Sequence, residues 1–227
     1  MGITDRYRNA ADMPRELAMF PLRGAILLPR ASLTLNVFEP RYLALVDHVL
    51  AGNRLIGVVQ PAPEAGDAES PKGRTFPLRS VGCAGRLFSF TENDDGRVVI
   101  ALAGIARFTI GGDIAGDTPF RICEVDCAPF ADDFIAGCGE EEVDRPRLLD
   151  ALKNYLTASN LNADWDRING ASSERLVNTL SILSPYGPEE KQALLEAPDL
   201  RSRAEALVAL AEMELATRDD GSGTSLQ

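Results

Sequence analysis

Four cysteines and one histidine are the side chains of this sequence best suited to bind a metal: Cys83, Cys123, Cys127, Cys138 and His48. A zinc site needs four ligands around one point. Residues 121–127 alternate in polarity with a period of two, which predicts a strand. At about 3.3 Å per residue, Cys123 and Cys127 would lie about 13 Å apart in that strand, too far to share a metal or a disulfide. We therefore predict small core cysteines, a surface or core-edge His48, no metal site and no cofactor.

Acidic runs also have a structural explanation. Glu140, Glu141 and Glu142 precede a helix that we expect to start at Pro146, and the helix dipole favours negative charge at that end. The acidic pairs at 94–95 and 132–133 lie in a predicted hairpin and a predicted loop, without the spacing of a calcium-binding EF-hand. We assign these carboxylates a structural role.

Motifs for catalysis are missing from the sequence. There is no Gly-x-x-x-x-Gly-Lys-Ser/Thr loop to hold ATP. The three lysines are Lys72, Lys153 and Lys191, and none sits beside a serine in a pattern that would activate a nucleophile. We predict no catalytic residue. A hydrolase with an unrecognised site remains an alternative, and it would need a cleft with a nucleophile, a base and an oxyanion hole.

Composition limits the class of partner. A length of 227 residues with 45% hydrophobic residues suffices for one large domain, or for a domain with a helical extension. The formal net charge of −11 would repel phosphate, so we predict no binding to nucleic acid or to an anionic membrane. No apolar stretch at the amino terminus resembles a signal peptide or a membrane span. A cytoplasmic location is the default expectation.

The elements that would position any site divide into two kinds. Up to about Phe134, short alternating runs are broken by glycine and proline, which is typical of a small β-barrel or sandwich. Within this part a helix is predicted from Pro40 to a glycine cap at Gly52. Beyond it, apolar residues at helical spacing predict helices after Pro146, after the caps Ser172 and Ser173, after Pro188 and from about Asp199. Phe20 and Phe38 are predicted to be core residues.

Three segments of this sequence match, in order, a known family. The first is 20–29 with 33–42, the second comprises 81–87, the hairpin at 94–100 with its Asp95-Gly96 turn, and 104–110, and the third is 190–196. Together they span about residues 15 to 215, and the chain thereby resembles the Lon protease N-terminal domain family. The resemblance implies an α+β fold: a PUA-like β-barrel at 14–134, then a C-terminal α-helical bundle at 140–217. Lon proteases carry ATPase and peptidase modules after this domain, and we expect the chain to end before either, as a stand-alone, non-catalytic protein.

The resemblance also implies a role in protein binding. The family's domain is thought to engage protein substrates or partners, so we expect unfolded segments or partner proteins as ligands, in an adaptor or quality-control role. A β-rich barrel can take up an extended peptide by strand addition. The polar or amphipathic residues of the matched segments that could line such a surface are Arg23, Glu39, Arg41, Tyr42, Arg97 and Arg107. Equally, Glu39, Arg41 and Arg107 could form internal ion pairs and Tyr42 could pack in the core.

Other readings stay open. A PUA-like nucleic-acid or small-ligand binder is suggested by fold analogy alone. A scaffold, with a dimer as one possible state, would be favoured by an exposed apolar patch on the helical part. The termini at 1–13 and 218–227 and the acidic loop at 61–74 are predicted to be mobile, because their residues can bury little apolar surface. The loop is either a solvated insertion or a functional segment.

Overall fold

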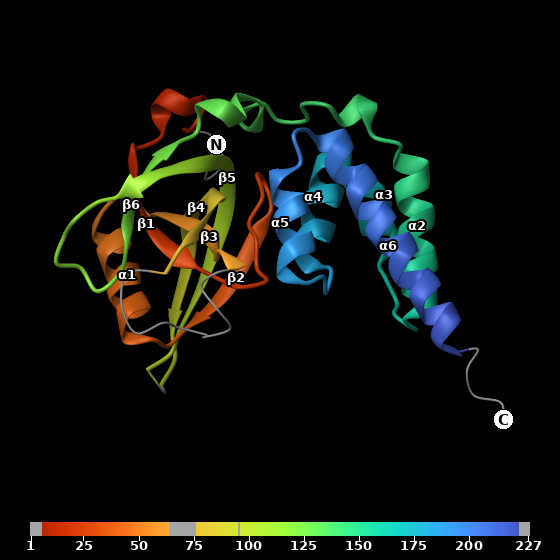
Figure 1. Ribbon diagram of the computed structural model, residues 1–227, viewed down its shortest axis with the longest axis horizontal. Helices are drawn as coiled ribbons and strands as arrows, with labels where there is room; N and C mark the ends of the chain where they lie inside the picture. The colour runs from red at the N-terminus through yellow and green to blue at the C-terminus, as the bar shows by residue number, and fades with distance from the viewer. Residues whose placement is uncertain (1–5, 64–75, 95, 223–227) are drawn as a thin grey trace.

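The computed structural model describes residues 6–63, 76–94 and 96–222 (Figure 1). Within them, six strands form one mixed sheet in the order β2-β5-β4-β3-β1-β6, and β5 also pairs with β6. The latter pairing closes five strands into a small barrel, and β2 extends the sheet beyond β5. The strands are β1 (Glu16–Pro21), β2 (Ser32–Val37), β3 (Leu55–Pro61), β4 (Leu78–Glu92), β5 (Val98–Asp113) and β6 (Ile122–Asp126).

Helices make up much of the rest of the described chain, and the fold is α+β as predicted. The α-helices are α1 (Pro40–Ala51), α2 (Arg145–Ala158), α3 (Trp165–Gly170), α4 (Ser173–Leu183), α5 (Pro188–Glu196) and α6 (Leu200–Ser222). Short 3-10 helices are η1 (Ala10–Asp12), η3 (Ala128–Phe134) and η4 (Glu140–Glu142). Figure 1 shows α1 on one side of the barrel and α2 to α6 on the other, with α5 nearest the strands.

Local signals explain where α1 begins and ends. Pro40 occupies the first turn, where its missing N–H costs no hydrogen bond, and Gly52 is the C-cap. The predicted stripe of Tyr42, Leu45 and Val46 is buried against the barrel. The crossover that contains β2 and α1 then allows β1 and β3 to run parallel, with Phe20 opposite Val58.

The strands and the C-terminal helices share one apolar core. Ile100 and Leu102 of β5 belong to the same buried cluster as Leu176 of α4 and Leu207 of α6. Buried amide side chains satisfy polar groups at the contact: the Gln60 amide nitrogen donates to the Pro188 carbonyl (2.8 Å) and to the Gln192 side chain (3.0 Å). The helices therefore pack directly on the sheet.

Some predictions about flexible and acidic segments need correction. Residues 6–13 were expected to be part of a mobile arm, but Tyr7 and Met13 are buried in a second apolar cluster that includes Phe108. The last helix continues past Thr217 to Ser222. Glu140 was expected to stabilise the start of α2 through the helix dipole. Its carboxylate instead accepts the Glu174 backbone N–H at the start of α4 (2.7 Å). Most of the 61–74 loop lies outside the described residues.

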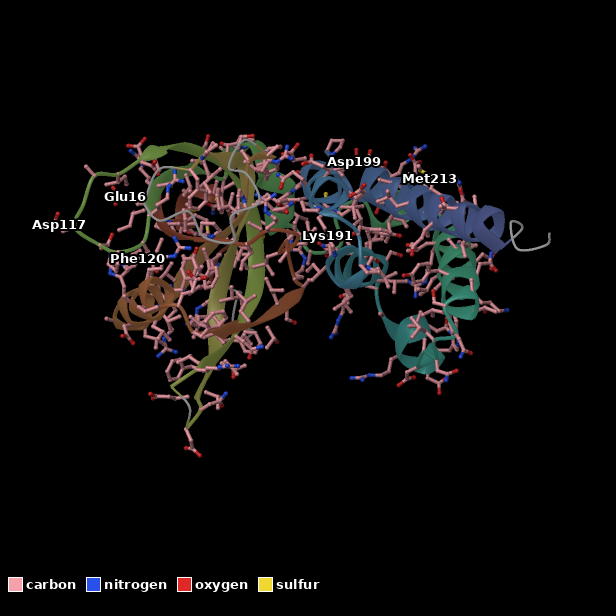
Figure 2. The ribbon with its side chains drawn as sticks, turned by 60° about the horizontal axis from the view of Figure 1, so that its bottom comes forward. Glu16, Asp117, Phe120, Lys191, Asp199 and Met213 are labelled. Carbon is pink, nitrogen blue, oxygen red and sulfur yellow. The ribbon has the colours of Figure 1, made fainter. Side chains whose placement is uncertain are left out.

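Lys191 of α5 is a buried cation at the end of another helix (Figure 2). The residue is 2% exposed, and its ammonium donates to the carbonyl oxygens of Ser181 (2.8 Å) and Ile182 in the last turn of α4. These carbonyls have no intrahelical partner, so a cation there is favourable. Burial nevertheless lowers the pKa of Lys191 from 10.5 to about 8.

This shift predicts a pH dependence of stability. Between the folded pKa of about 8 and the ordinary value of 10.5, the unfolded chain binds more protons than the folded one. The Lys191 contribution to the free energy of unfolding should therefore rise with pH across this window, by at most about 1.4 kcal/mol per pH unit. Urea unfolding of the parent and of Lys191→Met at pH 7, 8, 9 and 10 measures the difference. The free energy of unfolding of the parent should rise with pH relative to that of Lys191→Met. If it does not, the assignment of Lys191 as a buried ammonium is wrong.

Candidate functional site: an aromatic groove beside the first helix

A groove of about 440 Å³ opens between the end of β1, the end of β2 and the first turn of α1. We refer to it as the aromatic groove, after four aromatic side chains that line it: Phe20, Phe38, Tyr42 and Phe76. It also contains Arg23, Glu39 and Arg41. The structure thus brings four of the six predicted site residues, Arg23, Glu39, Arg41 and Tyr42, to one surface.

The floor of the groove is a stack of rings. Phe20 and Tyr42 lie with their centroids 4.3 Å apart and their planes 16° from parallel. The Arg41 guanidinium covers Tyr42 at 4.5 Å from the ring centroid. Burial raises the pKa of Tyr42, and the neighbouring Arg41 charge partly offsets that effect. The phenol therefore stays neutral at physiological pH and offers an apolar ring with a polar tip.

Arg41 and Glu39 form an ion pair at the entrance to α1. The Arg41 Nε and Nη2 atoms each lie 3.1 Å from Glu39 Oε2. Both residues flank Pro40, so this ion pair is local to the start of α1. The Arg41 guanidinium also hydrogen-bonds the Tyr42 side chain, so its charge is held at the surface of the groove.

Phe38 is exposed, and its predicted place in the core is wrong. It follows Val37, the last residue of β2, whose side chain points inward and is buried. Successive side chains of a strand alternate between faces, so Phe38 is directed outward and is 64% exposed. The Phe38 ring is therefore a largely exposed aromatic side chain on the wall of the aromatic groove.

The groove continues into a smaller cavity of about 130 Å³ that shares Pro21, Arg41, Tyr42 and Phe76 and adds Phe120 and Arg121. Arg121 donates to the Phe76 carbonyl (2.6 Å) and forms a two-pronged ion pair with Asp113. Sequence reasoning did not identify Phe76 or Arg121 as site residues. The only signal for Phe76 was an aromatic residue that directly precedes a proline after a polar loop.

The other two predicted site residues lie elsewhere. Arg97 is exposed beside the turn that joins β4 and β5, where its carbonyl accepts the Asn93 N–H (2.8 Å). Gly96 in this turn has a φ of +77°, as the hairpin prediction requires, although Asp95 falls outside the described residues.

Arg107 is 3% exposed and takes part in an internal ion pair, as the alternative prediction held. Its Nε and Nη2 atoms donate to the two carboxylate oxygens of Asp133, at 2.9 Å each. Its Nη1 atom donates to the carbonyl oxygens of Leu195 (3.2 Å) and Ala197 (2.5 Å), between α5 and α6. Arg107 thus links the barrel to the helices and does not reach the aromatic groove.

Three of the four cysteines are core residues as predicted, and the prediction is wrong for Cys138. Cys83, Cys123 and Cys127 are buried, and Cys138 is exposed. Burial raises the pKa of the Cys123 and Cys127 thiols to about 12, so both are protonated at neutral pH and are poor nucleophiles and metal ligands. Over the described residues, no group of three or more histidine, cysteine or acidic side chains could hold a metal ion. No helix among the same residues is long and apolar enough to cross a bilayer.

Similar structures share the fold. The Lon N-terminal domain protein from Xanthomonas campestris is 24% identical with a TM-score of 0.59, and the alignment covers 86% of this chain and 97% of that one. The N-terminal domain of Mycobacterium avium complex Lon protease is 18% identical with a TM-score of 0.61, over 87% and 98% of the two chains.

Curated relatives extend the likeness to sequence. The Lon protease of Cytophaga hutchinsonii is 28% identical over 211 residues, and that of Desulfosudis oleivorans is 23% identical over 214 residues. The alignments cover 90% and 89% of this chain, but only 25% and 24% of those proteases. The family model for the ATP-dependent protease La (LON) substrate-binding domain matches residues 16–212. Since this match covers most of the chain, the protein belongs to the LON substrate-binding domain family.

Proposed function

We propose that this protein is a substrate-recognition module that binds unfolded segments or partner proteins through the aromatic groove. The observation that carries the proposal is the clustering of an exposed Phe38, a stacked Phe20–Tyr42 pair and Arg41 on one surface. A few hot-spot residues dominate the binding energy at protein interfaces, and they are enriched in tryptophan, tyrosine and arginine. Membership of a substrate-binding domain family supports the same role.

The finer parts of the proposal are a non-catalytic, cytoplasmic adaptor in proteolysis or quality control. In this view a PUA-like unit at 14–134 supplies the groove, and a helical bundle at 140–217 supports it. Arg97 does not line the groove, but it precedes Val98, which pairs with Val37 of the groove wall, so it would contribute from the β4–β5 hairpin. The chain spans about a quarter of the length of the Lon proteases that it matches, so their activities are not transferred to it.

A small-ligand binder is a second candidate, because a groove of about 440 Å³ has the size of a typical small-molecule site. Its aromatic walls would favour a flat, apolar compound. Binding of an unfolded polypeptide to the purified protein separates the two candidates, because a site built for a small molecule would not bind the polypeptide.

The first experiment tests the groove with Phe38→Ser. Because Phe38 is 64% exposed, its loss should change stability by less than about 0.5 kcal/mol. We expect affinity for a permanently unfolded, cysteine-alkylated polypeptide to fall by about tenfold or more, as for an aromatic anchor. Fluorescence anisotropy measures the affinity, and thermal unfolding checks the fold.

The matched control is Leu183→Ser on α4, which removes another exposed apolar side chain (72% exposed) that does not line the groove. It should leave binding unchanged. Equal affinities for the parent and both variants would show that the aromatic groove is not the binding surface.

A further inference from the structure

One strand of the described sheet has a neighbour on a single side. β2 pairs with β5, from Ser32 opposite Ala103 to Val37 opposite Val98. Each other described strand has strand partners on both of its edges over at least part of its length, because the β5–β6 pairing closes the barrel. Within the described residues, the second edge of β2 therefore has no strand partner.

The pairing identifies which backbone groups lie on that edge. Arg30 has a φ of 58° and its N–H donates to the Gly104 carbonyl, while the Gly104 N–H donates to the Ala31 carbonyl (2.9 Å). This is a bulge, and it directs the Ala31 carbonyl toward β5. Because backbone groups alternate in an antiparallel ladder, those of Ser32, Thr34 and Asn36 point away from β5.

This edge lacks the usual protection against pairing. Natural sheets shield an open edge with charged residues, proline or a bulge within the strand. The sequence of β2 is Ser-Leu-Thr-Leu-Asn-Val, without a charge or a proline, and its pairing with β5 has no register shift. Such a strand is a ready template for a further strand.

The edge belongs to the aromatic groove. Leu35, Asn36 and Val37 all line it, and three consecutive residues of a strand can do so only where the backbone itself forms the wall. Arg23 and Arg41 line the same groove in a chain whose net charge is −11. Guanidinium groups bind carboxylates with charge-assisted hydrogen bonds.

We propose that β2 receives an extended peptide as an added strand, with alternating apolar side chains over the aromatic walls and a carboxylate near Arg23 or Arg41. This inference rests on the proposed function and specifies its binding mode and ligand chemistry. Main-chain hydrogen bonds to Thr34 and Asn36 supply affinity for many sequences, and the arginines select acidic segments over basic ones.

The test uses the intact protein and a fluorescein-labelled peptide of the pattern Asp-Ser-Val-Ser-Phe-Ser-Asp-Ser, in which the aspartate and apolar side chains share one face of a strand. Two further versions carry backbone N-methyl groups at the odd or at the even positions. An added strand uses every second N–H. One methylated version should therefore bind about tenfold more weakly or worse, while the other binds like the parent peptide. Replacing both aspartates by lysine should also weaken binding about tenfold.

Changes to the protein provide the complementary test. Thr34→Pro removes one outward N–H at an edge position, where proline is tolerated, and should reduce peptide affinity about tenfold. Leu183→Ser is the control, and its affinity for the peptide should not change. If Thr34→Pro does not fold, the N-methyl comparison on the parent protein still decides the question.

Each outcome has a distinct meaning. If the two methylated peptides bind with equal affinity, whether that affinity matches the parent peptide's or is much weaker, strand addition is wrong. Failure of the acidic peptide to bind overturns this ligand chemistry, while the unfolded polypeptide still tests the groove through Phe38. If the unfolded polypeptide also fails to bind, the proposed function itself is wrong.

Discussion

Asp133→Ala is expected to lower the free energy of unfolding by about 3–5 kcal/mol, because it leaves the Arg107 guanidinium buried without its counter-ion. Asp133 accepts hydrogen bonds from both the side chain and the backbone N–H of Arg107 (2.8 Å for the latter). The Arg30 guanidinium also donates to the Asp133 carbonyl (2.7 Å). Urea unfolding followed by circular dichroism measures the loss.

Glu212→Ala is the matched control for this prediction. Glu212 pairs with Arg147 at 3.2 Å, and both side chains are more than half exposed. Solvent screens such a pair, so its loss should cost at most about 1 kcal/mol. A similar small loss for Asp133→Ala would mean that the buried pair does not hold the barrel and helices together.

Gly104→Ala is expected to destabilise the protein by about 3 kcal/mol or more, through overpacking against the main chain. A Cβ atom at this position would lie 2.0 Å from the Leu28 carbonyl oxygen, closer than any real contact. The segment before β2 would have to move, and with it the bulge that sets the register of β2. We therefore expect weaker peptide binding in addition to a lower melting temperature.

Gly112→Ala, in the same strand, separates this clash from the general effect of losing a glycine. No atom lies within 4 Å of a Cβ built at Gly112. Its stability should change by less than about 0.5 kcal/mol. If Gly104→Ala melted at the same temperature as Gly112→Ala, the close approach of Leu28 to β5 would not be needed for the fold.

Elements with local signals were predictable from the sequence. Pro40 and Gly52 define α1, and Ser172 caps α4 by accepting the Arg175 N–H (3.3 Å). Short elements were missed because distant contacts hold them. The η4 turn, for example, is tied to α4 by Glu140, 34 residues before its partner Glu174. No periodicity in a three-residue element could reveal such a contact.

The groove was predictable where its residues belong to one matched segment. Arg23, Glu39, Arg41 and Tyr42 were grouped on that ground, and all four line the groove. The exposure of Phe38 was missed because hydrophobicity alone does not fix which face of a strand end a residue takes. The partner of Arg107 is 26 residues away in a 3-10 helix, and local sequence carries no sign of it.

The two hydrogen bonds from Arg107 to Leu195 and Ala197 end on main-chain carbonyls. Every amino acid supplies such a carbonyl, so mutations at these two positions can accumulate in evolution without breaking the contact. The contact between Arg107 and these two carbonyls would then produce no correlated substitutions among homologues. Conservation of the junction would depend on the arginine and its aspartate, while Leu195 and Ala197, both buried, would be constrained by packing and not by these hydrogen bonds.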